Sequence, residues 1–205
     1  MDRPLVSVIT PTWNRRDLLL EAVENVRAQT YRPLEHVIVS DGPDPELAEL
    51  LAREHGAGVP IRSVELGRNF TEGGPPNSFG IGALTAGMLL ARGEYQVWLC
   101  DDERMAPDHI AGLVAALEET GAGFAYSKTR MYWVGQTPES GWDIGVCPPQ
   151  YGQITNFLYR SALLRVAMPA WGAHPADWTL VASWMQAGER CAFLPRVTLT
   201  HRADR

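Results

Sequence analysis

The sequence predicts an α/β fold, a Rossmann-like αβα sandwich built around a mainly parallel central sheet. Strand-like and helix-like segments alternate over the first 127 residues, which is the order that buries a parallel sheet between two layers of helices. With 205 residues, of which 45% are hydrophobic and 20% charged, the chain fits one packed domain. Disordered and fibrous classes are excluded.

The first elements are marked by β-branched runs and by helical spacing. Residues 5–10 are rich in β-branched side chains and are closed by Pro11, which predicts a buried strand that ends in a loop. A helix follows, with Asn14 as its cap and with apolar residues along one face over 18–26. Residues 34–40 form the second predicted strand.

Glycine and proline punctuate the next part of the chain. A helix is expected over 44–56, because a capping Asp and a Pro open it and a Gly can close it. Residues 61–66 form a third strand, and a Gly/Pro-rich connection over 67–76 leads to a helix over about 77–91. The apolar run 95–100 is the fourth strand.

The second half is less regular, and each of its elements is expected from a short local pattern. In order, we expect a helix from Pro107, strands over 124–127 and 131–134, a flexible Gly/Pro-rich loop over 135–152, a strand over 153–159, helices over 161–167 and 177–187, and a strand over 191–200.

Charge and cysteine content exclude several classes of partner. The 18 basic and 24 acidic residues give a formal charge of −6, so neither nucleic acid nor an anionic membrane is the expected partner. Three widely spaced cysteines without a C-x-x-C pair indicate neither a disulfide framework nor a zinc knuckle, and fit a reducing cytoplasm. No apolar stretch approaches the roughly 18 residues of a membrane span, and we expect no signal peptide.

Polar residues follow several predicted strands, where ligands bind in open α/β sheets. Asp101, Asp102 and Glu103 come directly after a buried strand. A divalent cation relieves repulsion among such carboxylates, and Mg²⁺ or Mn²⁺ held there can bridge the phosphates of a nucleotide. The alternative is a solvated acidic turn that caps the next helix.

The Asp41-Gly42 pair after the second strand is a weaker signal. A carboxylate can accept hydrogen bonds from a ribose or from a base edge, and glycine lets a ligand approach closely. An ordinary turn has the same sequence. The glycines at 67 and at 73–74 match neither G-x-G-x-x-G nor G-x-x-x-x-G-K-[ST], which disfavours a dehydrogenase or a P-loop enzyme.

Further candidates lie in the second half, each with a structural alternative. Asp177 suits either a general base or a helix cap. His201 suits a metal or phosphate ligand or an ordinary surface residue. Four tryptophans offer flat faces to a sugar ring or serve the core, namely Trp133, Trp142, Trp171 and Trp178.

Several linked motifs resemble glycosyltransferase family 2. Its opening is matched by the segments 6–15, 29–31 and 34–42. The resemblance then spans nearly the whole chain and continues through 93–99, 101–107, 156–160, 177–180, Gly188, 193–195 and His201.

The resemblance implies a GT-A fold with a smaller acceptor-side region, and divides the single domain 1–205 into a nucleotide-sugar half (1–103) and an acceptor-side half (104–205). It also implies a metal-dependent inverting glycosyltransferase that uses a nucleoside diphosphate sugar, most simply a UDP-sugar, and a small-molecule or glycan acceptor. The nucleotide contacts it implies are Pro11, Thr12, Asn14, Arg15, Asp41 and Asp101.

Catalytic and metal roles also follow from the resemblance. Asp177 matches the catalytic base, which takes the proton of the acceptor hydroxyl. Arg202 is placed beside the diphosphate. Mg²⁺ or Mn²⁺ is assigned to Asp102, Glu103 and His201.

Two departures from the family pattern keep other readings open. Ala176 stands where the family often has Glu before the base, and Cys100 stands where many members have the first Asp of the acidic motif. A degenerate nucleotide-binding or sugar-binding partner subunit is therefore one alternative. A sugar nucleotidyltransferase is another, although residues 11–17 lack its Gly-rich loop. The acceptor site is expected from the segment after Val134 or from a partner chain, such as a second copy in a homodimer.

Overall fold

The computed structural model describes residues 3–54, 58–72, 80–168 and 176–203. Its strands are β1 (Val6–Thr12), β2 (Leu34–Ser40), β3 (Ile61–Glu65), β4 (Tyr95–Trp98), β5 (Glu103–Met105), β6 (Phe124–Trp133), β7 (Trp142–Ile144), β8 (Leu158–Arg160) and β9 (Cys191–Ala203). Its α-helices are α1 (Arg16–Arg27), α2 (Leu47–Glu54), α3 (Ile81–Leu90), α4 (His109–Thr120) and α5 (Ala176–Gln186), and short 3₁₀ helices span η1 (Pro138–Ser140) and η2 (Ser161–Arg165).

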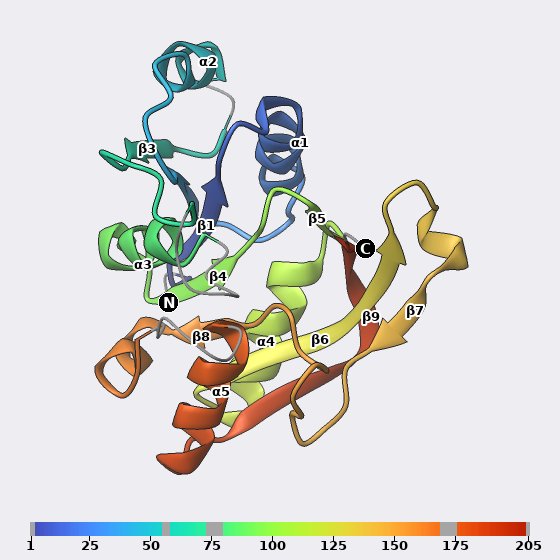
Figure 1. The fold of residues 1–205 in the computed structure, drawn as a ribbon. Helices are drawn as coiled ribbons and strands as arrows, with labels where there is room; N and C mark the ends of the chain where they lie inside the picture. The colour runs from blue at the N-terminus through green and yellow to red at the C-terminus, as the bar shows by residue number, and fades with distance from the viewer. Residues whose placement is uncertain (1–2, 55–57, 73–79, 169–175, 204–205) are drawn as a thin grey trace.

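All described strands belong to one curled sheet with the order β3-β2-β1-β4-β8-β6-β9-β5, and β7 pairs with β6 (Figure 1). β3, β2, β1 and β4 are mutually parallel. Every residue of β2 is buried, as expected for an inner strand covered on both faces. The alternating first half therefore forms the predicted parallel sheet, with its strand ends at one edge.

Beyond β4 the sheet changes character. β8 runs antiparallel to both β4 and β6, whereas β9 runs parallel to β6 along its whole length. β5 pairs antiparallel with the last part of β9, in a register that sets Glu103 opposite His201. The sheet thereby brings the C-terminal strand to the acidic segment that follows β4.

Helices cover both faces of this sheet, because neighbouring residues of a strand point to opposite sides. Val8 of β1 packs in a cluster with α1 and α4, whereas Ile9 packs in a second cluster with α3 and α5. A third cluster joins α1 and α2 over Ile38 of β2. Figure 1 shows α4 and α5 on opposite sides of β6. The αβα sandwich is thus confirmed.

Several local predictions need correction. Residues 124–127 and 131–134 belong to one strand, β6, whose pairing with β9 shifts at Lys128, the polar interruption in the sequence. The expected loop over 135–152 contains η1 and β7, since β7 pairs with β6. The expected strand over 153–159 is limited to β8, and the helix over 161–167 is the 3₁₀ helix η2.

Asn14 does not cap the first helix. The N-cap residue of α1 is Arg15, without a side-chain capping hydrogen bond. Asn14 has a φ of 53°, in the left-handed region that Asn tolerates better than most residues. Its place at the end of β1 is therefore a sharp turn that directs the chain into α1.

None of the helices in the described ranges combines the length and apolar character needed to cross a bilayer.

Candidate functional site

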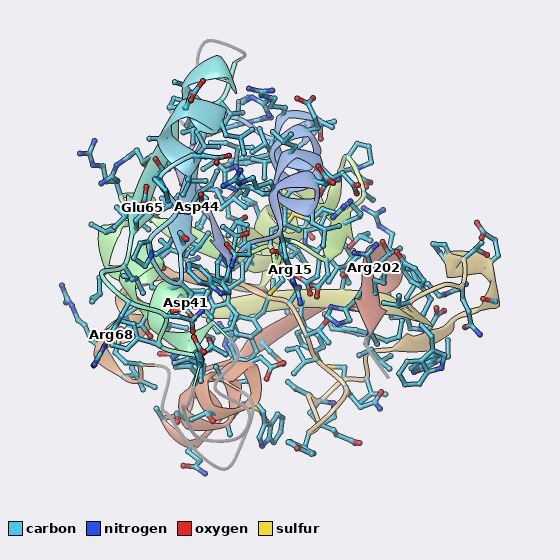
Figure 2. The ribbon with its side chains drawn as sticks, turned by 45° about the horizontal axis from the view of Figure 1, so that its top comes forward. Arg15, Asp41, Asp44, Glu65, Arg68 and Arg202 are labelled. Carbon is cyan, nitrogen blue, oxygen red and sulfur yellow. The ribbon has the colours of Figure 1, made fainter. Side chains whose placement is uncertain are left out.

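A cavity of about 760 Å³ opens where the first strands end. Thr12 of β1, Asp41 after β2 and Asp101 after β4 line one part of it, and His201 and Arg202 of β9 line another. Figure 2 labels Arg15, Asp41 and Arg202, which reach this cavity from three separate segments. The sheet therefore gathers at one place most of the polar residues that the sequence indicated.

Asp101 links the end of β4 to the end of β1. The Thr12 hydroxyl donates a hydrogen bond to Asp101 Oδ2 at 3.1 Å, and Arg15 Nη1 donates to Oδ1 at 3.1 Å. Burial raises the pKa of Asp101, and the positive charge of Arg15 offsets only part of that rise. Asp101 thus holds β1, β4 and the Arg15 guanidinium in fixed relation.

Asp102 lines the cavity and has unused hydrogen-bonding capacity. Its Oδ2 lies 3.4 Å from Arg15 Nη1, while its Oδ1 is buried without a hydrogen-bond partner among the described residues. Its backbone carbonyl accepts a hydrogen bond from the Arg202 N–H at 3.2 Å. A buried carboxylate oxygen without a donor is costly, so the position suits a cationic ligand.

Buried Glu103 pairs with the partly exposed His201. Glu103 Oε2 accepts the Cys100 N–H at 3.0 Å, and Oε1 lies 3.3 Å from His201 Nδ1. Burial alone would lower the pKa of His201, but the hydrogen bond and the charge of Glu103 outweigh it, and the net shift is upward. The neighbouring Cys100 thiol stays neutral, because burial and the surrounding carboxylates raise its pKa.

Asp41 secures the connection after β3. Its Oδ1 accepts the Phe70 N–H at 3.1 Å, and its Oδ2 accepts the Thr71 N–H at 3.1 Å and the Thr71 hydroxyl at 2.5 Å. Only 2% of Asp41 is exposed. These bonds place Asn69, Thr71 and Glu72 on the wall of the cavity.

Trp13 is a lining residue to which the sequence analysis gave no role. Its ring packs against Gly42, where a Cβ atom would lie 2.4 Å from the indole. Gly42 also has a φ of +144°, in the region that favours glycine. Pro11 also lines the cavity, whereas Asn14 does not line it in the described part of the chain.

Asp177 is the second residue of α5. Its side-chain Oδ1 accepts a hydrogen bond from the Trp178 backbone N–H at 2.7 Å. Burial, together with the negative charge of Glu103, raises the pKa of Asp177 to about 6, although the helix-terminal hydrogen bond and His201 oppose the shift. The charges of Glu103 and His201 both act on Asp177, although Asp177 is not among the described residues that line the cavity. Asp177 is therefore a residue of the first turn of α5 rather than its N-cap, and its carboxylate is a proton acceptor suited to near-neutral pH.

The tryptophans separate into distinct environments. Trp133 and Trp142 pack together on β6 and β7, with ring centroids 5.1 Å apart, and neither is among the described residues that line the cavity. Trp178 meets the ring of Tyr151 edge-on at 6.0 Å, and Tyr151 is 59% exposed. Tyr151 went unnoticed in the sequence, because only the fold brings it to the start of α5. Trp171 lies outside the described residues.

The cavity-lining groups fit a divalent cation whose coordination would be completed by the phosphates of a substrate. Asp102 and His201 supply oxygen and nitrogen donors on its wall, and Asp102 Oδ1 lacks a partner in the described ranges. No group of three or more His, Cys, Asp or Glu side chains in those ranges forms a full metal site alone. One or two protein ligands plus phosphates are the usual arrangement for Mg²⁺ at nucleotide sites.

Several curated proteins with similar sequences are glycosyltransferases by name. The uncharacterized glycosyltransferase RP339 of Rickettsia prowazekii is 32% identical over 108 residues, which cover 52% of this chain and 30% of that protein. The galactofuranosyltransferase GlfT1 of Mycolicibacterium smegmatis is 32% identical over 104 residues, covering 51% of this chain and 32% of that protein. The chain thus spans about a third of the length of these relatives.

Solved structures share the fold. The mannosyltransferase PcManGT from Pyrobaculum calidifontis, in complex with GDP-Man and Mn²⁺, superposes with a TM-score of 0.74 at 22% identity, over 98% of this chain and 57% of that one. S. aureus TarS 1-349 with UDP-GlcNAc gives 0.72 at 16% identity, over 98% and 58%. The GT-A architecture is therefore shown.

The family model for Glycosyl transferase family 2 matches residues 7–141, which hold β1 to β6 and the whole acidic segment. This chain belongs to glycosyltransferase family 2.

Proposed function

We propose that the chain is a metal-dependent inverting glycosyltransferase, which moves a sugar from a nucleoside diphosphate donor to an acceptor hydroxyl. The observation that carries the proposal is the convergence of Asp101, Asp102 and His201 at the strand-end cavity. Asp177 lies within electrostatic reach of His201 and Glu103. Ligands of open α/β sheets bind at such strand ends. The fold neighbours that hold GDP-Man and UDP-GlcNAc support a nucleotide-sugar donor.

The nucleoside end of the donor is assigned to the part of the cavity lined by Trp13, Thr12 and Asp41. The indole offers a flat apolar face, and the polar groups around it supply hydrogen bonds. The loop held by Asp41 adds Asn69 and Thr71 to this wall. We take UDP as the first nucleotide to test and GDP as the second.

The diphosphate end is assigned to the part lined by Arg15, Asp102, His201 and Arg202. Asp102 and His201 would hold Mg²⁺ or Mn²⁺, which when bound neutralises charge that grows on the departing diphosphate. The neighbour that contains Mn²⁺ with its sugar nucleotide supports this choice. Arg15 and Arg202 add fixed positive charge, and charge stabilisation that strengthens in the transition state lowers the barrier.

Asp177 is assigned the general-base role. As the acceptor oxygen attacks the anomeric carbon, the carboxylate takes the hydroxyl proton, and the bond between that carbon and the diphosphate oxygen breaks on the opposite face. A pKa of about 6 leaves Asp177 ionised at neutral pH while keeping it a stronger base than an ordinary aspartate. The acceptor, a small molecule or a glycan, would enter from this side.

Turnover of sugar nucleotides tests the proposal. The protein is incubated with Mn²⁺, a panel of UDP- and GDP-sugars and simple glycan acceptors, and release of nucleoside diphosphate is followed. Asp177→Asn should lower kcat by roughly 10² to 10⁴-fold while the nucleotide Kd stays unchanged. The control is Asp143→Asn, which removes a carboxylate paired with Arg130 away from the cavity.

The outcomes separate the proposal from its alternatives. Metal-dependent release that is lost in Asp177→Asn and kept in the control supports the transferase. Nucleotide binding without any release would favour a degenerate partner subunit instead. Release that persists in Asp177→Asn would contradict the base assignment.

A further inference from the structure

Glu103 is the one member of the acidic segment that lies behind the cavity wall. It is 2% exposed, and among the described residues the cavity is lined by Asp101, Asp102 and His201 but not by Glu103. Both of its carboxylate oxygens already face protein groups, the Cys100 N–H at 3.0 Å and His201 Nδ1 at 3.3 Å. Its carboxylate therefore faces a cavity residue rather than the cavity.

The sheet holds this pair in register. Glu103 on β5 and His201 on β9 are direct antiparallel partners, and the next residue of β9 donates its backbone N–H to the Asp102 carbonyl at 3.2 Å. The backbone thus fixes the approach of Glu103 to the imidazole. An ionised carboxylate can only accept hydrogen bonds, so a hydrogen bond to it at this contact requires a proton on Nδ1 of His201.

We propose that Glu103 is a positioning residue, which accepts the Nδ1–H of His201 and so presents the Nε2 lone pair to the cavity as a ligand for a divalent cation, together with Asp102. Histidine ligands of metals commonly donate their second ring N–H to a carboxylate, which fixes the tautomer and the ring orientation. This inference rests on the metal dependence proposed above. It differs from the sequence expectation, in which Glu103 binds the cation directly.

Two observations favour positioning over direct ligation. Glu103 is 2% exposed and is not among the described residues that line the cavity, so to reach a cation there its carboxylate would have to move away from its contacts with His201 and the Cys100 N–H. Asp102, by contrast, has a buried oxygen with no hydrogen-bond partner in the described residues. The cation can therefore be held by Asp102 and His201 without breaking either bond of Glu103.

A double-mutant cycle separates the two roles. Binding of Mn²⁺ in the presence of UDP, or of GDP if that is the nucleotide bound, is measured from the electron paramagnetic resonance of free Mn²⁺. Four proteins are compared, the wild type, Glu103→Gln, His201→Ala and the double variant. Glu35→Gln serves as the matched control, because Glu35 is also buried and accepts hydrogen bonds from Ser7 and the Arg92 N–H, away from the cavity.

We expect Glu103→Gln to weaken Mn²⁺ binding by about 10 to 100-fold, the usual effect of losing such an outer partner, and the control to leave it unchanged. In the His201→Ala background, Glu103→Gln should add less than about a twofold effect, because contacts that act through one residue are not additive. If Glu103→Gln weakens Mn²⁺ binding as much in the His201→Ala background as in the wild type, Glu103 binds the cation directly, and the proposal is overturned. Absence of Mn²⁺ binding by the wild type overturns the proposed metal itself, which is a different result.

The imidazole tautomer gives a readout that needs neither metal nor substrate. In metal-free protein at about pH 9, ¹⁵N spectra of labelled histidine should show His201 protonated at Nδ1, with its signal identified by its loss in His201→Ala. Which ring nitrogen carries the proton is set by the hydrogen bond that the other makes. A His201 protonated at Nε2 would contradict the proposal even if Mn²⁺ binds.

Discussion

The fold disfavours the ionised form of Asp177, which costs stability at neutral pH. Burial of its carboxylate, together with the negative charge of Glu103, raises the pKa of Asp177 from 3.8 to about 6. The folded protein therefore binds this proton more tightly than the unfolded chain does. Stability is lost as the pH rises from about 4 through 6, and the penalty is complete above that window.

Asp177→Asn should thus stabilise the metal-free protein above pH 6. Asparagine keeps the oxygen that accepts the Trp178 N–H but carries no charge. Since each pKa unit corresponds to about 1.4 kcal/mol, a gain of about 3 kcal/mol is expected at pH 7.5 and almost none at pH 4. Urea denaturation in chelator at both pH values measures it. A variant less stable than wild type at pH 7.5 would show that the carboxylate is not desolvated as described.

The position of the Trp13 ring depends on Gly42, which is 29 positions away in the sequence. Gly42→Ala would place a methyl group 2.4 Å from the indole at a φ of +144°, so the ring must move out of its place on the cavity wall. Nucleotide affinity should fall by about tenfold or more, as measured by calorimetry, because about 1.4 kcal/mol of contact energy is a factor of ten.

Gly135→Ala is the matched control for Gly42→Ala. Gly135 also has a positive φ, of +84°, but an added Cβ there meets nothing within 4 Å. The Gly135→Ala variant therefore has the strain of a positive φ but no collision with a neighbouring side chain. Equal affinities of the two variants would mean that Trp13 does not contact the nucleotide.

Some residues of the cavity were predictable from a local signal, and others only from the family resemblance. Asp41, Asp101 and Asp102 follow buried strands, where polar groups of an α/β sheet meet. Trp13 and Tyr151 were not found, since their surroundings come from Gly42 and Trp178, which are distant in sequence. The packing of Glu103 behind His201 was equally hidden, because it depends on the pairing of β5 with β9.

The close approach of α3 to the sheet depends on Gly87. A Cβ atom at this position would lie 2.4 Å from Ile9 Cγ2 of β1 and 3.3 Å from Val39 Cγ2 of β2. These strands carry Thr12 and Asp41 at their ends. Gly87 therefore sets the spacing between the helix and the strands that bear the site.

Gly87→Ala should destabilise the protein by about 1 to 3 kcal/mol, the typical cost of overpacking a core, despite the roughly 1 kcal/mol that alanine gains over glycine in a helix. Gly112→Ala in α4 is the comparison, because its Cβ meets only the side-chain ends of Arg196 and Leu194 at 3.1 Å. Denaturation curves of both variants test this. Gly87→Ala as stable as wild type would mean that α3 can shift freely on the sheet.

Elements with a local pattern were predicted well, and those that need a distant partner were not. The parallel strands and α1, α2 and α4 follow from apolar periodicity. β7 exists only because it pairs with β6, and β6 continues through its polar centre because β9 supports it along its length. A short sequence window contains neither partner, which is why the second half departs from expectation.

The architecture joins two halves at the cavity. The parallel strands β1, β2 and β4 carry the side of the cavity to which we assign the nucleotide, and the return of β9 beside β5 brings His201 and Arg202. The GT-A fold could be predicted from the alternation and the linked motifs. The curl of the sheet that closes the cavity could not, since it arises from pairings that mix parallel and antiparallel strands across the chain.

Calorimetric titration of UDP and GDP, with Mn²⁺ and again with chelator, tests the proposed donor site most directly, with Asp102→Ala beside the wild type. We predict that one diphosphate binds with Mn²⁺, and that chelator or Asp102→Ala weakens this binding by about tenfold or more, since each removes the link between carboxylate and phosphates. Binding that is equally tight with chelator and in Asp102→Ala, or no binding of either diphosphate, would contradict the metal-diphosphate site.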